Sequence, residues 1–282
     1  MANKALLEEP QPPIPAFAPY DRVLTPLDGS TLAETALPLA RLIATRAGIA
    51  IKLIRALEGR AEAEAAVTHL RGIAESLGAD YELTTPDESV ADWILEQVDA
   101  RTLLVMATHG RSGVGELIAG SVAMSLVRES YLPVLLVGPG VTAPLTAPNT
   151  VVVALDGGPF AEEILPFAAS FARWLGAEVQ LVQALRGNQG DSGPPGDVLE
   201  TGYVMRKARE LRNATGVSAS YEILHGGPVS ALTLYMAGRT DAILAMTTHA
   251  RVGVAANVFG SVTAGCLRNS GVPVLTCQPL DV

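Results

Sequence analysis

The sequence has few aromatic residues and no long apolar run, and both absences limit the kinds of protein that it can form. Aromatic residues make up 5% of the 282 residues, so any core must be built mainly from alanine, valine, leucine and isoleucine. No stretch approaches the roughly 18 uninterrupted apolar residues of a membrane-spanning helix. The first residues, MANKALLEEPQPPIPAF, contain no apolar signal segment. We therefore expect a cytoplasmic protein that has no membrane partner.

Cysteine is scarce as well. The two cysteines are Cys266 and Cys277, and neither has a CxxC partner, which argues against a bound metal. We expect both to be buried thiols in a reducing compartment.

Positive charge is also in short supply, because the formal net charge is −9. Nucleic acids and anionic membranes require a basic face, so neither is an expected partner. A small anion held by backbone groups is still compatible with this charge. The sequence lacks the GxxxxGK[ST] phosphate loop, and no GxGxxG follows its first predicted strand, which argues against a P-loop ATPase and a dinucleotide enzyme.

The most informative stretch occurs twice. Residues 104–139 and 244–279 share residues at a constant spacing of 140 positions, which indicates an internal duplication. The matched residues are His109, Arg111, Gly113, Gly120, Ser121, Val122, Arg128, Ser130 and Pro133, which correspond to His249, Arg251, Gly253, Gly260, Ser261, Val262, Arg268, Ser270 and Pro273.

Length and duplication predict the same domain organisation. A chain of 282 residues suggests two domains, at roughly 150 residues each. We expect a proline-rich leader at 1–19, a first copy at 20–139, a linker at 140–148 and a second copy at 149–282. The two aspartates that follow the first strand of each copy, Asp28 and Asp156, are 128 positions apart, and the surplus loop 186–197 accounts for the difference of 12.

Each copy alternates short apolar strands with amphipathic helices, which predicts a parallel sheet covered on both faces. The expected strands are 23–27, 49–56, 80–84, 103–106 and 134–137, then 150–155, 178–184, 218–224, 241–246 and 273–277. The expected helices are 31–47, 58–77, 89–98 and one after Gly120, then 160–175, 197–214, 228–238 and 260–270. The fold class is therefore α/β, with two tandem doubly wound sheets of five parallel strands.

In a doubly wound sheet, ligands bind beyond the carboxyl ends of the strands, where the strand order reverses. The Asp28 turn, Ala56 and the loop 107–121 follow the first, second and fourth strands, so we expect them at one edge. Small residues before a helix let a phosphate approach free backbone N–H groups.

These residues resemble the universal stress protein family, as a tandem member of its ATP-binding branch. That branch has the loop pattern Gly-x2-Gly-x9-Gly-Ser/Thr. The first copy reads Ala107-Thr-His-Gly110, nine residues, then Gly120-Ser121, and departs only at Ala107. The resemblance covers about residues 20–139 and 149–279. It implies an adenine nucleotide α-hydrolase-like fold and antiparallel pairing of strands 134–137 and 274–277.

The resemblance also implies ATP, with Mg²⁺, as the bound cofactor. Adenine and ribose are expected near Pro26, Leu27, Asp28, Ala56 and Met106, and the phosphates near Gly110, Arg111, Gly120, Ser121 and Val122. The corresponding residues of the second copy are Asp156, Ala184, Arg251, Gly260, Ser261 and Val262. That copy reads Thr247-Thr-His-Ala250 and has lost both early glycines. The pattern therefore favours nucleotide binding at the first copy over the second.

Several interpretations stay open at this point. Asp28 either contacts ribose or only caps the helix that follows. Arg111 either pairs with phosphate or is a solvated charge, and His109 and His249 are either loop residues hydrogen-bonded to the backbone or catalytic bases. The chain is thus an ATP-binding stress-response or regulatory protein, a non-nucleotide interaction and dimerisation module, or a slow ATPase. A homodimer of the whole chain is a further expectation.

Overall fold

The computed structural model describes residues 20–57, 63–109, 119–130, 132–142, 144–185, 197–248 and 259–279. Outside the described residues lie the leader 1–19, the loop residues 110–118 and 249–258, and residues 186–196 of the surplus loop.

The first copy contains five parallel strands: β1 (Arg22–Pro26), β2 (Ala50–Ala56), β3 (Asp80–Thr84), β4 (Thr102–Ala107) and β5 (Val134–Val137). Its helices are α1 (Leu37–Ala47), α2 (Ala63–Leu77), α3 (Val90–Glu96) and α4 (Ser121–Glu129), with a 3-10 turn η1 (Ala33–Ala36) before α1.

The second copy repeats this order. Its strands are β6 (Thr150–Leu155), β7 (Glu178–Leu185), β8 (Ala219–His225), β9 (Ala242–Thr247) and β10 (Val274–Cys277). Its helices are α5 (Pro159–Glu162), α6 (Leu165–Leu175), α7 (Asp197–Thr215), α8 (Pro228–Met236) and α9 (Ser261–Asn269). The predicted alternation of strands and helices is therefore confirmed.

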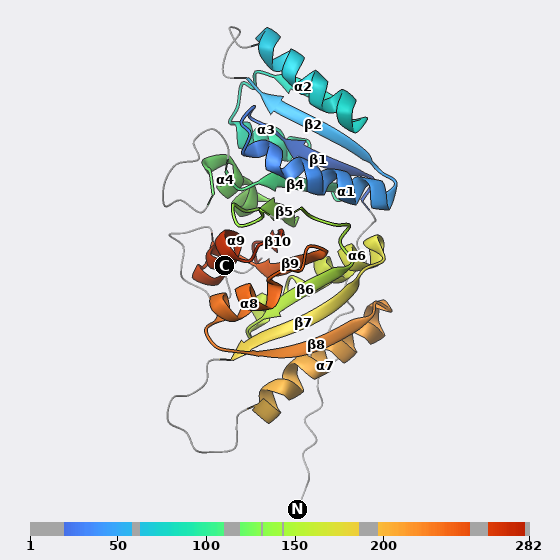
Figure 1. Ribbon diagram of the computed structural model, residues 1–282, viewed down its shortest axis with the longest axis vertical. Helices are drawn as coiled ribbons and strands as arrows, with labels where there is room; N and C mark the ends of the chain where they lie inside the picture. Colours follow the sequence, from blue (N-terminus) through green and yellow to red (C-terminus); the bar gives the residue numbers. More distant parts are fainter. Residues whose placement is uncertain are drawn as a thin grey trace, which may run out of the picture.

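The ten strands form one sheet in the order β3-β2-β1-β4-β5-β10-β9-β6-β7-β8, with the first copy above the second in Figure 1. The two five-stranded halves meet where β5 pairs antiparallel with β10, and Leu135 stands opposite Leu275. The predicted antiparallel pairing is thus correct. Because β5 and β10 pair with each other, the outer edge of each half-sheet at this junction is covered by the other half of the same chain.

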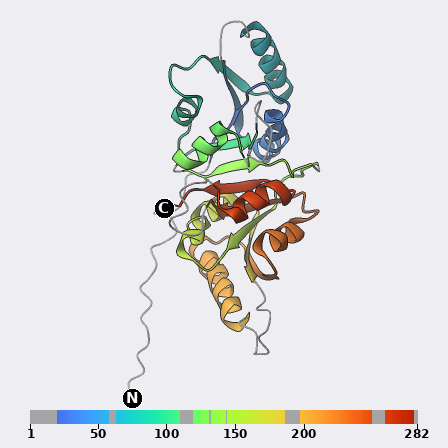
Figure 2. The same cartoon turned by 90° about the vertical axis from the view of Figure 1, so that its left-hand side faces the viewer.

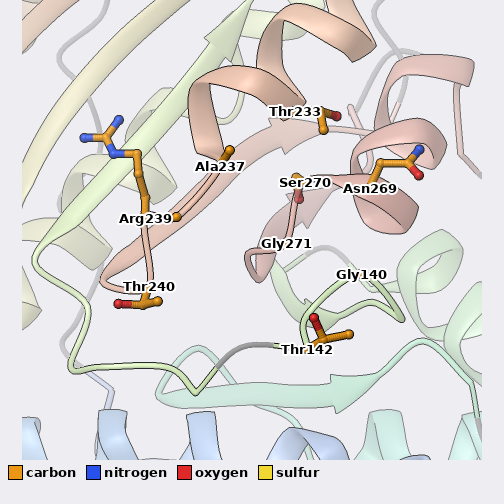
Figure 3. Close-up of a pocket in the computed structure, with 10 residues that line it drawn as sticks. Gly140, Thr142, Thr233, Ala237, Arg239, Thr240, Asn269, Ser270 and Gly271 are labelled. Carbon is orange, nitrogen blue, oxygen red and sulfur yellow. The ribbon is translucent and has the colours of Figure 1, made fainter.

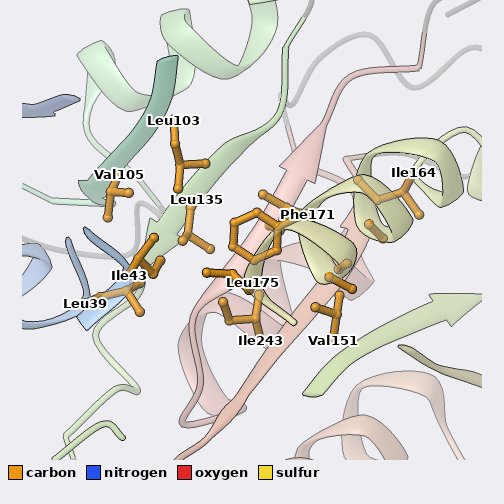
Figure 4. Packing of buried hydrophobic residues seen from close by; sticks show 14 of the residues in the cluster. Leu39, Ile43, Leu103, Val105, Leu135, Val151, Ile164, Phe171, Leu175 and Ile243 are labelled. Atoms are coloured by element: carbon orange, nitrogen blue, oxygen red, sulfur yellow. The ribbon is translucent and has the colours of Figure 1, made fainter. Parts of the chain in front are cut away.

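Helices cover both faces of the sheet, as Figure 2 shows from the side. Side chains of α1, α2, α6 and α7 belong to one buried cluster, and those of α3, α4, α8 and α9 belong to the other. Each cluster contains residues of both copies, so the cores are continuous across the β5–β10 junction. Figure 4 shows Phe171 of α6 in the same cluster as Leu135 of β5. Tyr20 reinforces the junction, because its ring lies 5.1 Å from that of Trp174.

Two predicted helices are wrong in their first turns. The helix expected at 31–47 divides into η1 and α1, and the one expected at 160–175 divides into α5 and α6. Pro38 and Pro166 occupy the first turn of α1 and α6. Proline has no N–H to continue a preceding helix and clashes with the previous turn, so the regular helix begins one residue before the proline in both copies. The start predicted at residue 58 for the second helix lies outside the described residues. The other boundaries agree with the predicted ones or differ from them by a few residues.

Both cysteines are buried, as expected. Burial raises the pKa of Cys266 to about 12 and, with a contribution from Glu163, that of Cys277 to about 12. Neither thiol is therefore a nucleophile at neutral pH.

Candidate functional site

In each copy the strand order reverses between the first and the fourth strand. β1 lies between β2 and β4, and β6 lies between β7 and β9. The register that places Leu24 opposite Leu104 brings the carboxyl ends of β1 and β4 to one edge. This is the switch point at which doubly wound sheets bind ligands.

Asp28 forms a tight turn directly after β1. Its Oδ1 accepts hydrogen bonds from the Ser30 N–H at 2.9 Å and from the Ser30 hydroxyl at 2.6 Å. The Ser30 Oγ in turn accepts from the Ala33 N–H at 3.1 Å, so Ser30 supports the start of η1. The capping interpretation of Asp28 therefore holds only indirectly, through Ser30. This turn occupies one oxygen of the carboxylate and leaves the ribose interpretation a prediction.

The end of β4 is tied to the start of α4 by backbone hydrogen bonds. The Thr108 N–H donates to the Val137 carbonyl at 3.0 Å, and the Gly120 N–H donates to the Thr108 carbonyl at 2.7 Å. Both ends of the loop that joins them are fixed at the carboxyl edge.

Helix α4 begins without a side-chain cap. The residue before it, Gly120, has φ −67° and ψ 163°, an extended conformation that any residue can adopt. Serine, threonine, aspartate or asparagine is preferred at such a position because the side chain accepts from the first helical N–H groups. Glycine leaves those groups of Ser121, Val122 and Ala123 without an intrahelical acceptor. The helix start therefore offers N–H groups and the exposed Ser121 hydroxyl to an anion.

The residues predicted for adenine and ribose line the strand ends beside this helix. Met106, Ala107 and Leu27 are buried, whereas Pro26 and Ala56 are half-buried. The Leu27 N–H donates to the Ile54 carbonyl at 2.8 Å and fixes the Asp28 turn against β2. The structure thus brings these segments to one edge.

The second copy repeats the geometry. The Thr248 N–H donates to the Cys277 carbonyl at 2.9 Å, and the Gly260 N–H donates to the Thr248 carbonyl at 2.7 Å. Gly260 is extended and α9 has no side-chain cap, so Ser261 and Val262 hold the places of Ser121 and Val122. Asp156 Oδ1 accepts from the Gly158 N–H at 2.8 Å, and Ala184 is half-buried at the end of β7.

Three predicted phosphate residues, Gly110, Arg111 and Arg251, lie outside the described residues, as does His249. His109 lies just inside them, and its Nδ1 is 2.9 Å from the Thr108 hydroxyl. His109 is therefore hydrogen-bonded as a loop residue, but to the Thr108 side chain, whereas a backbone partner was expected.

The prediction missed two residues at this edge. Arg55 stands one position before Ala56 in β2, and Gln183 stands one position before Ala184 in β7. They are 6% and 7% exposed. Each contains a buried polar atom that has no hydrogen-bond partner among the described residues, Nε of Arg55 and Oε1 of Gln183. The only available signal was a charged or polar residue inside an otherwise apolar strand.

A shallow pocket of about 250 Å³ lies elsewhere, at the amino ends of β9 and β10 (Figure 3). Residues of the linker, Gly140 and Thr142, form one wall, and Arg239, Thr240 and Asn269 contribute to the others. None of its lining residues belongs to the predicted site. Arg239 donates to Gln180 Oε1 at 3.0 Å from both terminal nitrogens, so its charge already has a structural role.

Comparison with known proteins identifies the family. The model of the universal stress protein family matches residues 57–138 and 148–278, which together exceed half of the chain. The chain belongs to the universal stress protein family. It contains two matches to that family in one polypeptide. Universal stress proteins of Mycobacterium tuberculosis (strain H37Rv) and Mycobacterium bovis are each 26% identical to it over 219 residues, covering 72% of this chain and 72% of each relative.

Solved structures of universal stress proteins show the same fold. One from Archaeoglobus fulgidus has a TM-score of 0.64 at 18% identity, covering 95% of this chain and 99% of its own. A putative universal stress protein from Pseudomonas aeruginosa has a TM-score of 0.60 at 20% identity, covering 93% and 94%. Over nearly their whole length, these two structures therefore share the α/β fold of this chain.

The part of the chain that the structure describes contains neither a metal-binding cluster nor a membrane-spanning helix. No three or more histidine, cysteine, aspartate or glutamate side chains come together there as a metal site. Among the same residues, every helix is too short or too polar to span a bilayer.

Proposed function

We propose that this universal stress protein binds an adenine nucleotide, ATP, at the carboxyl edge of the first copy and acts as a stress-response or regulatory protein. The observation that carries the proposal is the uncapped start of α4 at Gly120, held beside the end of β4. It lies at the same sheet edge as the Asp28 turn.

The adenosine part would lie over the ends of β1, β2 and β4. The half-buried Pro26 and Ala56 and the buried Met106 offer an apolar surface to a base. A carboxylate accepts hydrogen bonds from hydroxyl groups, and Asp28 stands at the end of β1 where a ribose would extend from that surface. The apolar surface thus suits the base of a nucleoside, and the carboxylate suits its ribose.

The phosphate groups would lie at Gly120 and Ser121. The N–H groups at the start of α4 and the helix dipole both favour an anion. The extended backbone of Gly120 does not require glycine, and we propose that the missing Cβ lets a ligand approach closely. Because the described residues bring no carboxylate cluster together, Mg²⁺ would be held mainly by the phosphates themselves, and Arg111 would add a cation.

The second copy keeps Gly260, Ser261 and Asp156 but has Ala250 in place of Gly110. A Cβ at that position hinders a left-handed backbone and close approach of a phosphate. We therefore propose weaker nucleotide binding there. Since the sequence has no phosphate-loop lysine, retention of ATP rather than rapid turnover is the proposed role.

The test is calorimetric titration of Mg-ATP into the full chain and into two matched variants, Gly120→Val and Gly260→Val. Both positions have the same extended backbone, so valine introduces no backbone strain at either one. Gly120→Val should remove the tight site, and Gly260→Val should leave it intact. Unchanged stoichiometry and affinity in Gly120→Val, with the variant folded by circular dichroism, would exclude the first-copy site.

A further inference from the structure

Arg55 is a buried cation for which the described residues provide no counter-ion. It is 6% exposed, no ion pair or hydrogen bond joins it to them, and its Nε is enclosed without an acceptor. Burying a charge is costly unless the charge is paired and hydrogen-bonded. A buried guanidinium of this kind would therefore be stabilised by an anion that pairs with it.

The guanidinium lies flat beneath the Asp28 turn. A Cβ built on Gly29 would stand 2.5 Å from Nη1, 2.6 Å from Cζ and 2.6 Å from Nη2 of Arg55. Gly29 therefore provides the space that the guanidinium occupies. The turn and the end of β2 fix the position of Arg55 at the carboxyl edge of the sheet.

The second copy shows that the fold does not require a charge at this place. Gln183 occupies the same position in β7, and its Nε2 lies 3.4 Å from where a Cβ on Gly157 would stand. The amide is neutral, equally buried, and leaves an acceptor, Oε1, without a partner. Arg55 thus gives the first copy a chemical function that the second copy lacks.

Arg55 also faces away from the proposed nucleotide surface. Side chains alternate along a strand, and Ile51 and Leu53 belong to the buried cluster beneath α1 and α2. Ile54 and Ala56 belong to the cluster on the other face. Arg55 therefore faces the α1 and α2 side, whereas Ala56 and Met106 face the opposite side.

We propose that Arg55 forms an oxyanion-binding site of the first copy, distinct from the nucleotide phosphate site, where a phosphate or carboxylate group of a small ligand pairs with the guanidinium. The planar guanidinium fork matches the oxygen pairs of both groups. The site lies against the Asp28 turn, and the second copy has no equivalent because Gln183 carries no charge.

The test observes the Arg55 Nε–Hε signal by ¹⁵N NMR while inorganic phosphate is added to the full chain at constant ionic strength. The spectrum of Arg55→Lys assigns the signal. It should shift and saturate with phosphate and stay unchanged with sodium chloride. Calorimetry should show that Arg55→Gln, which copies the second repeat, weakens phosphate binding about tenfold or more. The reciprocal Gln183→Arg should create a second responsive signal.

Two outcomes would overturn the proposal. One is an Nε–Hε signal that phosphate does not move, together with unchanged phosphate affinity in Arg55→Gln, which would mean that Arg55 pairs within its own chain. The other is a response to ATP but not to inorganic phosphate that disappears in Gly120→Val, which would make the anion part of the nucleotide. A phosphate response retained in Gly120→Val supports a separate site, whether or not that variant binds ATP.

Discussion

Replacing Gly29 by alanine should destabilise the protein more than the same replacement at Gly157, although the two glycines are equivalent in the two copies. Both have a left-handed backbone, with φ +82° at Gly29 and +89° at Gly157. They differ in what lies beneath them. A buried guanidinium occupies the Cβ position at Gly29, whereas an amide nitrogen stands 3.4 Å away at Gly157.

The difference can be estimated from this geometry. A left-handed conformation costs an alanine about 1–2 kcal/mol relative to glycine, and both variants bear this cost. At Gly29 the new methyl group would also stand 2.5–2.6 Å from three guanidinium atoms of Arg55. Displacing a packed side chain costs a further ~1–3 kcal/mol. We therefore expect losses of about 2–5 kcal/mol for Gly29→Ala and about 1–2 kcal/mol for Gly157→Ala.

Thermal unfolding followed by circular dichroism measures both losses. Each kcal/mol lowers the midpoint by about 2–4 °C in domains of about 150–250 residues. In an Arg55→Ala background the extra cost of Gly29→Ala should vanish, because the methyl group then has room. Equal shifts for the two single variants, or an extra cost that survives Arg55→Ala, would refute the described packing of Arg55 under the turn.

Three further predictions concern the rest of the fold. Gly138→Ala should lower the unfolding midpoint strongly, because its Cβ would stand 2.0 Å from a carbonyl oxygen of α9 in the other copy; a midpoint within a degree of wild type would contradict this contact. Lys207→Met should cost about 2 kcal/mol in urea unfolding, because the Lys207 Nζ lies 2.8 Å from Glu162 Oε2 and the lysine side chain is 8% exposed. Adding Glu162→Gln should recover part of the loss, and an unchanged stability of Lys207→Met would argue against the pair. Cys266 and Cys277, with pKa values raised by burial from 9.0 to about 12, should resist iodoacetamide at pH 8 unless urea is present. Their protonated form favours the fold below pH 9, and this contribution should be lost as the pH rises toward 12; rapid native alkylation would contradict their burial.

Most of the architecture could be predicted because it depends on local patterns. Alternating apolar strands and amphipathic helices fix a parallel sheet, and the duplicated loop fixes the number of copies. The division of the helices at Pro38 and Pro166 was also accessible, since proline in the first helical turn is a local rule. The pairing of β5 with β10 came from the family resemblance, because a four-residue apolar strand does not reveal its neighbour.

The site was less predictable where it depends on contacts between distant residues. Alternation along β2 indicates which face Arg55 occupies but not that its guanidinium lies beneath Gly29, where the described residues provide no carboxylate partner. Gly138 is a similar case, since nothing near it in the sequence indicates the close approach of α9. The structural role of such glycines and buried charges depends on residues that are distant in the sequence and meet only in the folded chain.

Native mass spectrometry of the intact chain with Mg-ATP tests the central claim most directly, because it counts nucleotides per polypeptide. Wild type should bind one ATP at low concentration, with a second only at higher concentration. Gly260→Val should retain the first ATP, and Gly120→Val should lose it. A wild-type chain that binds no ATP, or a first ATP that remains in Gly120→Val and is lost in Gly260→Val, would contradict the assignment of the site to the first copy.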